Sequence, residues 1–318
     1  MTPTQLRAFA AIVRHGTAKA AADELGISAA AISSHTAALR KELNDPLYHP
    51  SSAGLAFTPG GLRLAARAQE LLGLQEQTRQ EVLAASRGQR VLRLATTSLF
   101  AEYAAAGLLE LFKKRANDIE VEMSVHPSHR AAELLSSRQA DIVISPMSPI
   151  STHSFRSSQF LRYELVIVAS ANHPLAKSRG DAATLRSQTW FLGPSAAEER
   201  GATARLLKRF AVPEENQRIF QSHAAAISEI QTNGGIAILP DFRTASYLAN
   251  GSLKRISARG TTESGVWTAT SLVSSQTTAV AAELMRFITT PRATRAMLSG
   301  SGANIRHFRP SVHVTLWN

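Results

Sequence analysis

Apolar positions in the first 66 residues recur at helical spacing in three short blocks. The first block places its apolar side chains at i, i+3, i+4 and i+7, which is one face of a helix: Leu6, Phe9, Ala10 and Val13. Gly16 is expected to end this helix. A second helix is predicted over 18–25, between Thr17 as its N-cap and Gly26 as its C-cap.

The third block predicts a helix that begins after Ser28, its N-cap, and carries an apolar set at Ala31, Ile32, Leu39 and Leu43. Asn44 is expected to be its left-handed C-cap, and Pro46 prevents continuation. A turn over 51–54 then joins two short extended pieces, around Tyr48 and over 55–57. This order of three helices and a small hairpin is the plan of a winged helix-turn-helix.

A long helix follows. Thr58 and Pro59 form an N-cap followed by proline at the first helical position, and the helix is predicted to continue to Arg87-Gly88. Its apolar seam is only partial: Leu62, Ala65, Ala66, Gln69, Leu72, Thr78 and Val82. An exposed helix of this length needs a cover for its seam, and we predict that it is a dimerising linker. Packing on its own domain is the alternative.

From Val91 the pattern changes to short apolar runs that alternate with helical periods, which predicts βαβ units and a parallel sheet. The predicted strands cover 91–96, 119–126, 141–145, 164–170, 189–192, 218–220, 236–239 and 266–272. The predicted helices cover 100–115, 128–139, 198–210, 222–232 and 278–288. The tail over 306–317 alternates enough to form a last strand.

Composition narrows the class of protein. The chain has 318 residues, 44% of them hydrophobic and 19% charged, which is typical of a globular protein with room for two domains. It has no cysteine, which excludes disulfides, zinc–thiolate sites and a cysteine nucleophile. The first residues lack the apolar core of a secretory signal, and no apolar run approaches the roughly 18 residues of a membrane span. We therefore expect a cytoplasmic protein that does not contact membranes.

The net charge of +11 first suggests a nucleic-acid partner, because Lys and Arg neutralise phosphates; a cationic surface that binds nothing is the alternative. The location of the charge matters. Residues 1–88 hold nine basic and seven acidic residues, a net of +2, so the remaining +9 lies in 89–318. The excess therefore favours an anionic ligand, acidic surfaces or DNA against the second part of the chain.

The sequence resembles the LysR-type transcriptional regulators. The N-terminal match comprises Leu6-x-x-Phe9, Gly16-Thr17-x-x-x-Ala21-Ala22, Leu25-x-Ile27-Ser28-x-x-Ala31-Ile32-Ser33, Leu39, Leu43, Pro46-Leu47-Tyr48 and Phe57-Thr58-Pro59-x-Gly61. Two later pieces continue it: His173-Pro174-Leu175-Ala176, and the glycine-rich strand entry over 233–240. The resemblance extends from residue 4 to about 290.

The resemblance implies an α/β protein with an N-terminal winged helix-turn-helix (1–58), a linker and dimerisation helix (59–88) and a two-lobed, periplasmic-binding-protein-like effector domain (89–318). We expect lobe one over about 89–162 and 268–318, and lobe two over about 163–267. The resemblance also implies a homodimer or homotetramer that binds double-stranded promoter or operator DNA under the control of a small-molecule effector. It implies neither catalysis nor a cofactor.

The third helix would enter the major groove with its N-terminal half against base edges. Hydroxyl and imidazole groups could bond bases or phosphates, alanines could touch thymine methyls, and basic residues could neutralise phosphates. The predicted DNA-binding residues are Ser28, Ala29, Ala30, Ser33, Ser34, His35, Arg40, Lys41, and Ser51 and Ser52 in the wing. Among them, Ser28 is expected mainly to cap the helix.

Several positions depart from the family pattern. Ala29-Ala30 replaces a common Gln-Pro, Arg40 replaces a common Glu, Pro50 replaces a usual Arg, and the wing over 51–54 lacks basic residues. Residues 1–66 hold only six basic and four acidic residues. We therefore expect modest DNA affinity for each subunit, with several DNA-binding domains acting together on one site.

Two-lobed α/β domains bind ligands at the carboxyl ends of their strands, between the lobes. Here four predicted strand ends carry hydroxyl groups beside the start of a helix, where free N–H groups suit a carboxylate or phosphate. The predicted effector-binding residues are Thr97, Ser98, Ser128, Ser145, Gly193, Ser195 and Ser222. Plain N-capping is the alternative for each one alone. We expect the effector to be an organic anion.

Other chemistry finds little support. His126, His129 and His153 lack the spacing of metal ligands, and neither a Gly-x-Ser-x-Gly elbow nor a glycine-rich phosphate loop occurs. The rival classes are a solute-binding protein, which the absent export signal disfavours, and a small α/β enzyme, which the absent catalytic pattern disfavours. A regulator with a vestigial effector cleft remains an alternative.

Overall fold

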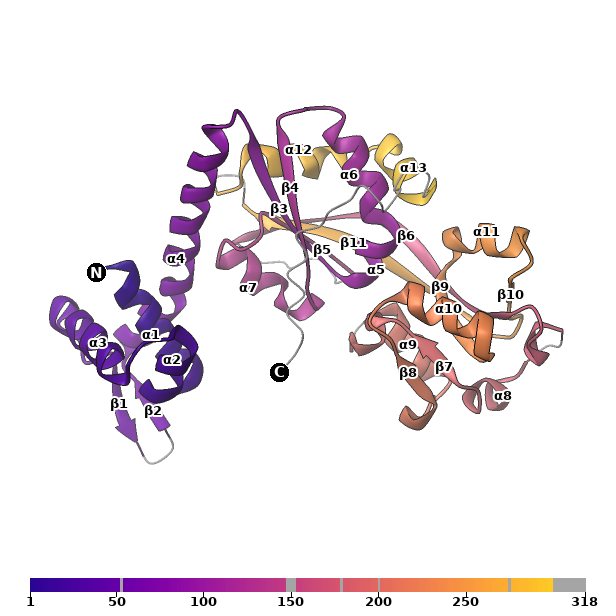
Figure 1. Ribbon diagram of the computed structural model, residues 1–318, viewed down its shortest axis with the longest axis horizontal. Coiled ribbons are helices and arrows are strands. Elements are labelled where there is room, and N and C mark those ends of the chain that lie inside the picture. Colours follow the sequence, from indigo (N-terminus) through magenta and orange to yellow (C-terminus); the bar gives the residue numbers. More distant parts are fainter. Residues whose placement is uncertain (52–53, 147–152, 178–179, 200, 274–275, 300–318) are drawn as a thin grey trace. The chain divides into compact units, whose positions relative to one another are not determined.

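The computed structural model describes residues 1–51, 54–146, 153–177, 180–199, 201–273 and 276–299 (Figure 1). These residues form two compact units. One comprises residues 1–86 together with 136–139, and the other comprises 87–135 and the described residues from 140 onward. The predicted strand over 306–317 lies outside the described residues.

The N-terminal unit has the predicted order of elements: α1 (Pro3–His15), α2 (Ala18–Leu25), α3 (Ala29–Leu43), β1 (Tyr48–Ser51) and β2 (Gly54–Phe57). Thr17 and Ser28 accept hydrogen bonds from backbone N–H groups three residues later, so both predicted N-caps are confirmed. Gly16, Gly26 and Asn44 adopt left-handed backbone conformations at the three helix ends, as predicted.

The antiparallel hairpin of β1 and β2 is held against the helices by a cluster of three aromatic rings. Phe9 of α1 stacks on Tyr48 of β1 and meets Phe57 of β2 edge to face, with both pairs of ring centroids 6.5 Å apart. Tyr48 and Phe57 also contact each other. Phe9 is fully buried, so the orientation of the wing depends on packing against α1.

Helix α4 (Pro59–Ala85) begins as predicted, with Thr58 accepting a hydrogen bond from the N–H of Gly61 at 2.9 Å. Gly61 is required by a close backbone approach, because a Cβ atom there would lie 1.8 Å from the carbonyl oxygen of Leu47. Asp45 accepts hydrogen bonds from the Thr58 hydroxyl and the Leu47 N–H, which lower the pKa of its carboxyl group. This joint fixes the start of α4 on the winged domain.

Part of the apolar surface of α4 is covered within the N-terminal unit. Leu64, Ala68 and Leu72 pack against Leu6 and Ala10 of α1. Other large apolar side chains of the helix are exposed: Leu62, Leu71, Leu74, Val82 and Leu83. The helix therefore has one face for its own domain and a second apolar surface that nothing in the described chain covers.

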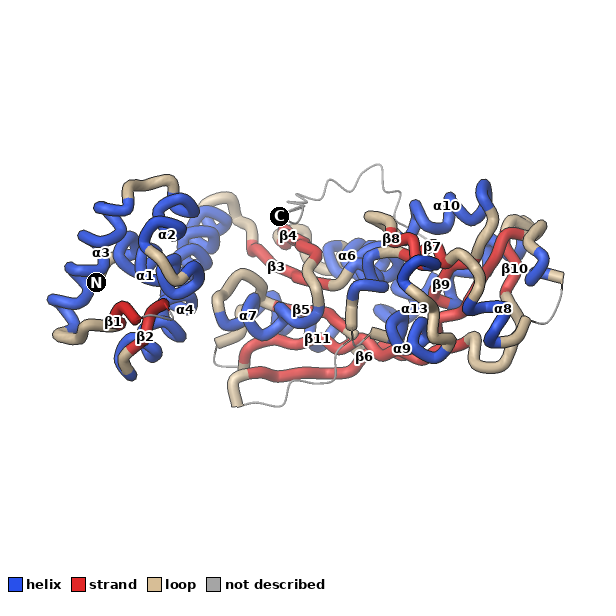
Figure 2. The backbone as a smooth tube through the Cα atoms, turned by 90° about the horizontal axis from the view of Figure 1, so that it is seen from below, coloured by secondary structure: helices blue, strands red, loops and turns tan. Residues whose placement is uncertain are grey.

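The C-terminal unit is built on a mixed sheet in the order β4-β3-β5-β11-β6-β9-β7-β8, with β10 paired to β6. Its strands are β3 (Arg90–Thr96), β4 (Ile119–Val125), β5 (Ile142–Ser145), β6 (Phe155–Ser170), β7 (Trp190–Leu192), β8 (Gln217–Ile219), β9 (Ile236–Pro240), β10 (Leu253–Arg255) and β11 (Thr262–Leu272). Figure 2 shows β6 and β11 running side by side along most of this unit.

We call the β3–β5 end of this sheet lobe one and the β7–β9 end lobe two. Lobe one carries α5 (Ser98–Phe100), the π-helical η1 (Ala101–Ala105), α6 (Ala106–Lys113), η2 (Ser128–Arg130), α7 (Ala131–Ser136), α12 (Ala279–Phe287) and α13 (Pro291–Ser299). Lobe two carries η3 (Pro174–Ala176), α8 (Ala182–Arg186), η4 (Pro194–Ala197), α9 (Ala202–Arg209), η5 (Glu214–Asn216), α10 (His223–Asn233), η6 (Asp241–Arg243) and α11 (Thr244–Ala249).

Three predicted boundaries in this unit were wrong by four residues or more. β6 begins at Phe155 rather than 164, because its first half pairs with β11 and becomes part of the ribbon between the lobes. β11 likewise begins at 262 rather than 266. α9 begins at Ala202 rather than 198, because Glu198 is extended and links η4 to the helix. Because Glu198 lies outside the helix, its side chain can reach Ser128 in lobe one.

Candidate functional site

The N-terminal half of α3 presents a small polar surface. Ala29, Ala30, Ser33 and Ser34 are exposed, whereas His35 is half-buried. The Ser33 hydroxyl donates to the carbonyl oxygen of Ala29 at 3.0 Å, so it faces along the helix and keeps its acceptor capacity. Ala29, Ala30, Ser33 and Ser34 thus share one accessible helix surface with the capping residue Ser28, whereas His35 lies on the other side of the helix.

Arg40, which is predicted to neutralise a phosphate, makes contacts inside the winged domain. Its guanidinium lies over the ring of Tyr48, 4.2 Å from the centroid, and donates to the Tyr48 carbonyl oxygen at 3.3 Å. Its Nε is buried without a hydrogen-bond partner. Arg40 therefore braces α3 against the wing, and the exposed Lys41 next to it is the better candidate for a phosphate contact.

The remaining predicted contacts of the winged domain are in the hairpin. Ser51 ends β1, Ser52 lies outside the described residues, and the structure describes no side-chain position for either. Among the basic residues of α1, Arg14 is paired with Glu24, which also bonds His15 at 2.7 Å. This ion pair joins α1 to α2 and reduces the positive charge that the domain can offer to DNA.

In the C-terminal unit, the carboxylate of Glu102 in lobe one reaches the first turn of α10 in lobe two. It accepts hydrogen bonds from the backbone N–H of His223 at 3.0 Å, the N–H of Ala224 at 3.1 Å and Nδ1 of His223 at 2.8 Å. Desolvation by burial raises the pKa of Glu102, but the bonds from His223 and Ala224 outweigh it and the net pKa is lowered. A charged carboxylate therefore occupies the start of this helix.

His223 extends this contact deeper into lobe two. Because a carboxylate only accepts, Nδ1 carries the hydrogen, and Nε2 faces the Ser195 hydroxyl at 2.8 Å. Ser195 in turn meets the hydroxyl of Thr203 at 3.0 Å. Gly193 fits under the imidazole, since a Cβ atom there would lie 2.4 Å from the ring. Gly193, Ser195 and Thr203 thus position His223 toward lobe one.

The chain Ser195–His223–Glu102 has the hydrogen-bond order of a hydrolase triad. Its serine is not presented as a nucleophile, because Ser195 is only 8% exposed and its oxygen is shared between His223 and Thr203. The same geometry explains a joint between the lobes, in which buried polar groups are satisfied by one another. We therefore interpret it as a structural latch.

A second carboxylate crosses in the opposite direction. Glu198, which follows η4 in lobe two, accepts hydrogen bonds from the Ser128 N–H with both oxygens at 3.1 Å and from the Ser128 hydroxyl. Ser128 begins η2, three residues after the end of β4 in lobe one, and is a predicted effector-binding residue. The donors that the prediction assigned to an effector anion are therefore engaged by a carboxylate of the chain itself.

The other predicted effector residues lie at the strand ends in different settings. The Thr97 hydroxyl is buried without a hydrogen-bond partner, at the end of β3 next to β4, while Ser98 is half-buried at the start of α5. Ser145 is buried in β5 opposite Thr268. Ser222 caps α10 by accepting from the Ala225 N–H, so capping accounts for its hydroxyl.

A third contact joins the lobes beside Glu102. Arg243 of η6 donates to the carbonyl oxygen of Tyr103 at 2.6 Å, and its guanidinium lies 5.8 Å from the centroid of the Tyr103 ring. The Tyr103 hydroxyl is buried without a partner, and burial raises its pKa. Arg243 therefore fixes the helix segment that carries Glu102 against lobe two.

Four charged or ionisable residues that join the lobes were not predicted from the sequence: Glu102, Glu198, His223 and Arg243. Glu102 lies one helical turn after Ser98 and so shares the face of a predicted effector residue, which was an available signal. His223 directly follows the predicted cap Ser222. Glu198 carried no such signal, because it was predicted to lie inside a helix.

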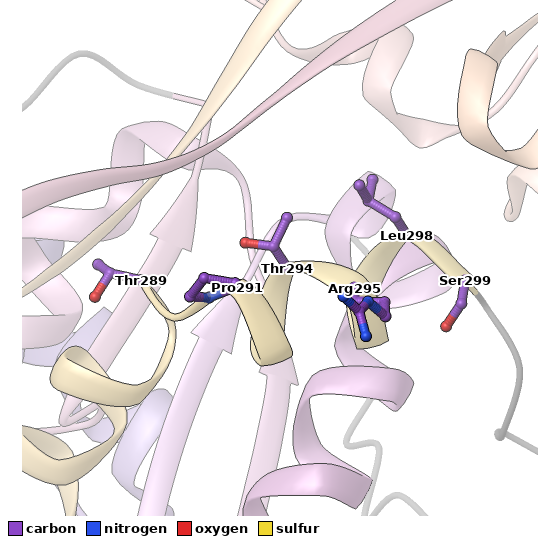
Figure 3. A pocket seen from close by; sticks show the side chains of 6 residues that line it. All are labelled: Thr289, Pro291, Thr294, Arg295, Leu298 and Ser299. Atoms are coloured by element: carbon purple, nitrogen blue, oxygen red, sulfur yellow. The ribbon is translucent and has the colours of Figure 1, made fainter.

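A hollow of about 600 Å³ lies elsewhere in this unit, along α13 (Figure 3). Its lining comes from α13 and the turn before it: Thr289, Pro291, Thr294, Arg295, Leu298 and Ser299. One helix thus supplies nearly all of the lining, and none of the predicted effector residues contributes. Within the described ranges, no group of three His, Asp or Glu side chains could hold a metal ion. No helix among these residues is long and apolar enough to cross a membrane.

Comparison with protein families identifies both units. Residues 3–62 match the model of the bacterial regulatory helix-turn-helix protein, lysR family, and residues 85–290 match that of the LysR substrate binding domain. An uncharacterized HTH-type transcriptional regulator of Mycobacterium tuberculosis is 50% identical over 321 residues, which cover 100% of both chains.

Solved structures show the same fold at low identity. The crystal structure of ArgP from Mycobacterium tuberculosis matches 93% of this chain and 97% of its own, with a TM-score of 0.59 and 17% identity. The regulatory domain of CcmR from Synechocystis PCC6803, solved in complex with 2-PG, matches 63% of this chain and 95% of its own, with a TM-score of 0.52 and 22% identity. The predicted winged helix-turn-helix of the N-terminal unit and the predicted α/β fold of the C-terminal unit are confirmed.

Proposed function

This chain belongs to the LysR family of bacterial transcriptional regulators, and we propose that it binds a specific operator as a homo-oligomer whose DNA contacts change with a small organic anion. The observation that carries the DNA part is the exposed surface of α3, where Ala29, Ala30, Ser33 and Ser34 lie together beside the exposed Lys41. Methyl and hydroxyl groups of this kind read thymine methyls and polar base edges in a major groove.

The anionic class of the effector is supported by the donors between the lobes. The first turn of α10 and the N–H and hydroxyl of Ser128 each already hold a carboxylate of the chain, from Glu102 and Glu198. The structural neighbour in complex with 2-PG indicates that a regulatory domain of this fold takes a small ligand. The net charge of +9 in residues 89–318 also favours an anion.

The oligomer is supported by the exposed apolar side chains of α4, which follow helical spacing at Leu71, Leu74 and Val82. We propose that α4 pairs with α4 of a second copy to form a dimer, and that two dimers form a tetramer on longer operators. The proposed boundaries are 1–58, 59–88 and 89–318, with lobes meeting near 162–163 and 267–268. The protein would act in the cytoplasm, where its DNA is.

Footprinting with the full chain tests this function. The purified protein is incubated with the intergenic DNA beside its own gene, with and without candidate organic acids. We expect the protein to protect a defined DNA sequence, and we expect a carboxylate to lengthen or shorten the protected region. Absence of any sequence-specific protection would contradict the DNA-binding role.

A second function within the same class is favoured by one observation. Because Glu102 and Glu198 already satisfy donors between the lobes, the cleft could be permanently closed and the regulator could act by oligomerisation alone. Thermal-shift screening of the full chain against small organic acids separates the two functions. Stabilisation by an acid favours the working cleft, and a flat response to every acid favours the closed one.

A further inference from the structure

The two carboxylates that cross between the lobes are not equally held. Glu102 accepts three hydrogen bonds, from two backbone N–H groups and one imidazole, and its side chain is 24% exposed. Glu198 is bonded to the N–H and hydroxyl of a single residue, Ser128, and both residues are only half-buried. Glu198 is therefore the carboxylate that an external anion could replace more easily.

We propose that Glu198 is a tethered competitor of the effector: it occupies the carboxylate position at Ser128, and the effector acts by displacing it. This inference rests on the proposed function, because it concerns the regulation of the same cleft. Both oxygens of Glu198 face one N–H at equal distances of 3.1 Å, a geometry that a planar carboxylate reproduces. The ligand that displaces it is thus a small carboxylic acid in its ionised form.

A displacing ligand can gain an interaction that Glu198 does not make. The Thr97 hydroxyl is buried without a partner and lies at the end of β3, beside the strand that leads to Ser128. The two strand ends are joined directly, since the His126 N–H donates to the Thr96 carbonyl oxygen at 2.9 Å. A carboxylic acid with a second polar group could satisfy Thr97 and so outweigh the tethered carboxylate.

Displacement of Glu198 would reach the latch formed by Ser195, His223 and Glu102 through a short backbone path. The Glu198 N–H donates to the Ser195 carbonyl oxygen at 3.3 Å, and the Ser195 hydroxyl holds the imidazole of His223. His223 in turn donates to Glu102. If the main chain at Glu198 moves with its side chain, the movement would pull on Ser195, which positions His223, and would couple the two carboxylate contacts between the lobes.

Competition predicts a specific change in affinity. If the tethered carboxylate occupies Ser128 in all but about 1–10% of molecules, the apparent Kd for an external carboxylate is raised by about 10- to 100-fold. Glu198→Gln removes the charge and should recover that factor. Glu199→Gln is the matched control, because Glu199 is exposed and next in sequence, so it removes the same charge without touching Ser128.

The test uses the full chain with acetate and glycolate as probes, and sodium chloride at equal concentration as the control for general anion effects. Binding is measured by thermal shift and by the intrinsic tryptophan fluorescence of the chain. E198Q should bind a probe at least tenfold more tightly than E199Q and the unsubstituted chain do, and a further Ser128→Ala change should reduce the gain, because it removes the hydroxyl and keeps the N–H. Equal affinities in E198Q and E199Q would overturn the proposal.

Two further outcomes keep the tests separate. If E198Q does not fold, Glu198→Asp, whose shorter side chain retracts from Ser128, replaces it and must show the same gain. If footprinting with the unsubstituted chain succeeds while E198Q gains no affinity, the tethered competitor is refuted and the proposed function stands. If footprinting fails while E198Q gains affinity, the DNA-binding role is refuted and the competition at Ser128 stands.

Discussion

His223 and Glu102 meet across the two lobes with Nδ1 and Oε1 2.8 Å apart, and the backbone N–H of the same histidine donates to the same carboxylate oxygen at 3.0 Å. One residue thus offers both its main chain and its side chain to an acid from the other lobe. Since His223 is only 2% exposed, the contact is shielded from water and contributes more than an exposed ion pair.

This contact predicts a pH-dependent stability. Burial raises the pKa of Glu102, the bonds from His223 and Ala224 lower it more, and the folded-state pKa lies below the ordinary value of 4.5. A lowered carboxyl pKa contributes stability that is fully present above the unfolded value and is lost as the pH falls through the folded value. Glu102→Gln should therefore reduce the free energy of unfolding by about 1–3 kcal/mol near pH 7.

Melting temperatures of the full chain and of E102Q between pH 3 and pH 7 check this prediction. Other carboxylates titrate in both proteins and cancel in the difference. The difference should be largest at neutral pH and should shrink as the pH falls below the ordinary carboxyl value of 4.5 and through the lowered pKa of Glu102. A difference that stayed constant across this range would mean that the charge on Glu102 does not stabilise the joint.

Gly193→Ala should weaken the contact between His223 and Glu102 by displacing the His223 ring. The new Cβ atom would lie 2.4 Å from Cγ and Cδ2 of His223, so the ring must move and its bond to Ser195 must lengthen. Overpacking of this kind costs about 1–3 kcal/mol. Chemical denaturation measures it. Gly201→Ala is the steric control: its Cβ atom would meet only Glu198, at ordinary distances of 3.4 and 3.5 Å, and because Gly201 is the N-cap of α9 the change should cost no more than about 1 kcal/mol.

Local sequence signals predicted the winged domain closely, because each boundary there depends on a residue that acts on its own neighbours. Thr17 and Ser28 cap with their own side chains, and Asn44 ends α3 in a left-handed conformation. The first half of β6 could not be predicted in this way. Its pairing with β11 involves residues more than a hundred positions apart, and its polar composition resembles a loop.

The sequence indicated which strand ends carry polar side chains, but it did not indicate the partners of these side chains. Hydroxyl groups at strand ends indicated where the lobes face each other. Ser128 bonds Glu198 across the lobes, and Ser195 bonds His223 inside lobe two. The identity of their partners depends on how lobe two folds back on lobe one, which no local pattern encodes. For that reason Glu102 and Glu198 were missed, although they decide what the donors bind.

Adjacent basic residues in α3 should affect DNA binding in different ways. Lys41→Ala should lower the slope of log affinity against log salt concentration by about 1 for each bound subunit, without a change in stability, because Lys41 is exposed. Arg40→Ala should instead destabilise the winged domain by about 1 kcal/mol, because it removes the stacking on Tyr48 and the bond to its carbonyl oxygen. Salt titrations of operator binding, paired with thermal melts, distinguish the two effects; identical behaviour of both variants would contradict the assignment.

The exposed side of α4 makes the last prediction. Leu71 and Val82 are 41% and 64% exposed, and their spacing places them on one face of the helix. Replacing both by Gln should raise the dissociation constant of the dimer at least ~10-fold, because each large apolar side chain that leaves water contributes roughly 1.5–3 kcal/mol. Sedimentation equilibrium of the full chain measures this change.

Leu83→Gln provides the control for that experiment. Leu83 is 43% exposed, a fraction similar to that of Leu71, but it is turned by about 100° from Val82 around the helix axis. If association depends on the face of Leu71 and Val82, L83Q should dimerise like the unsubstituted chain. If L83Q dissociates as readily as the double variant, the helices associate through a broader surface than the one proposed; if none of the variants dissociates, α4 does not hold the oligomer together.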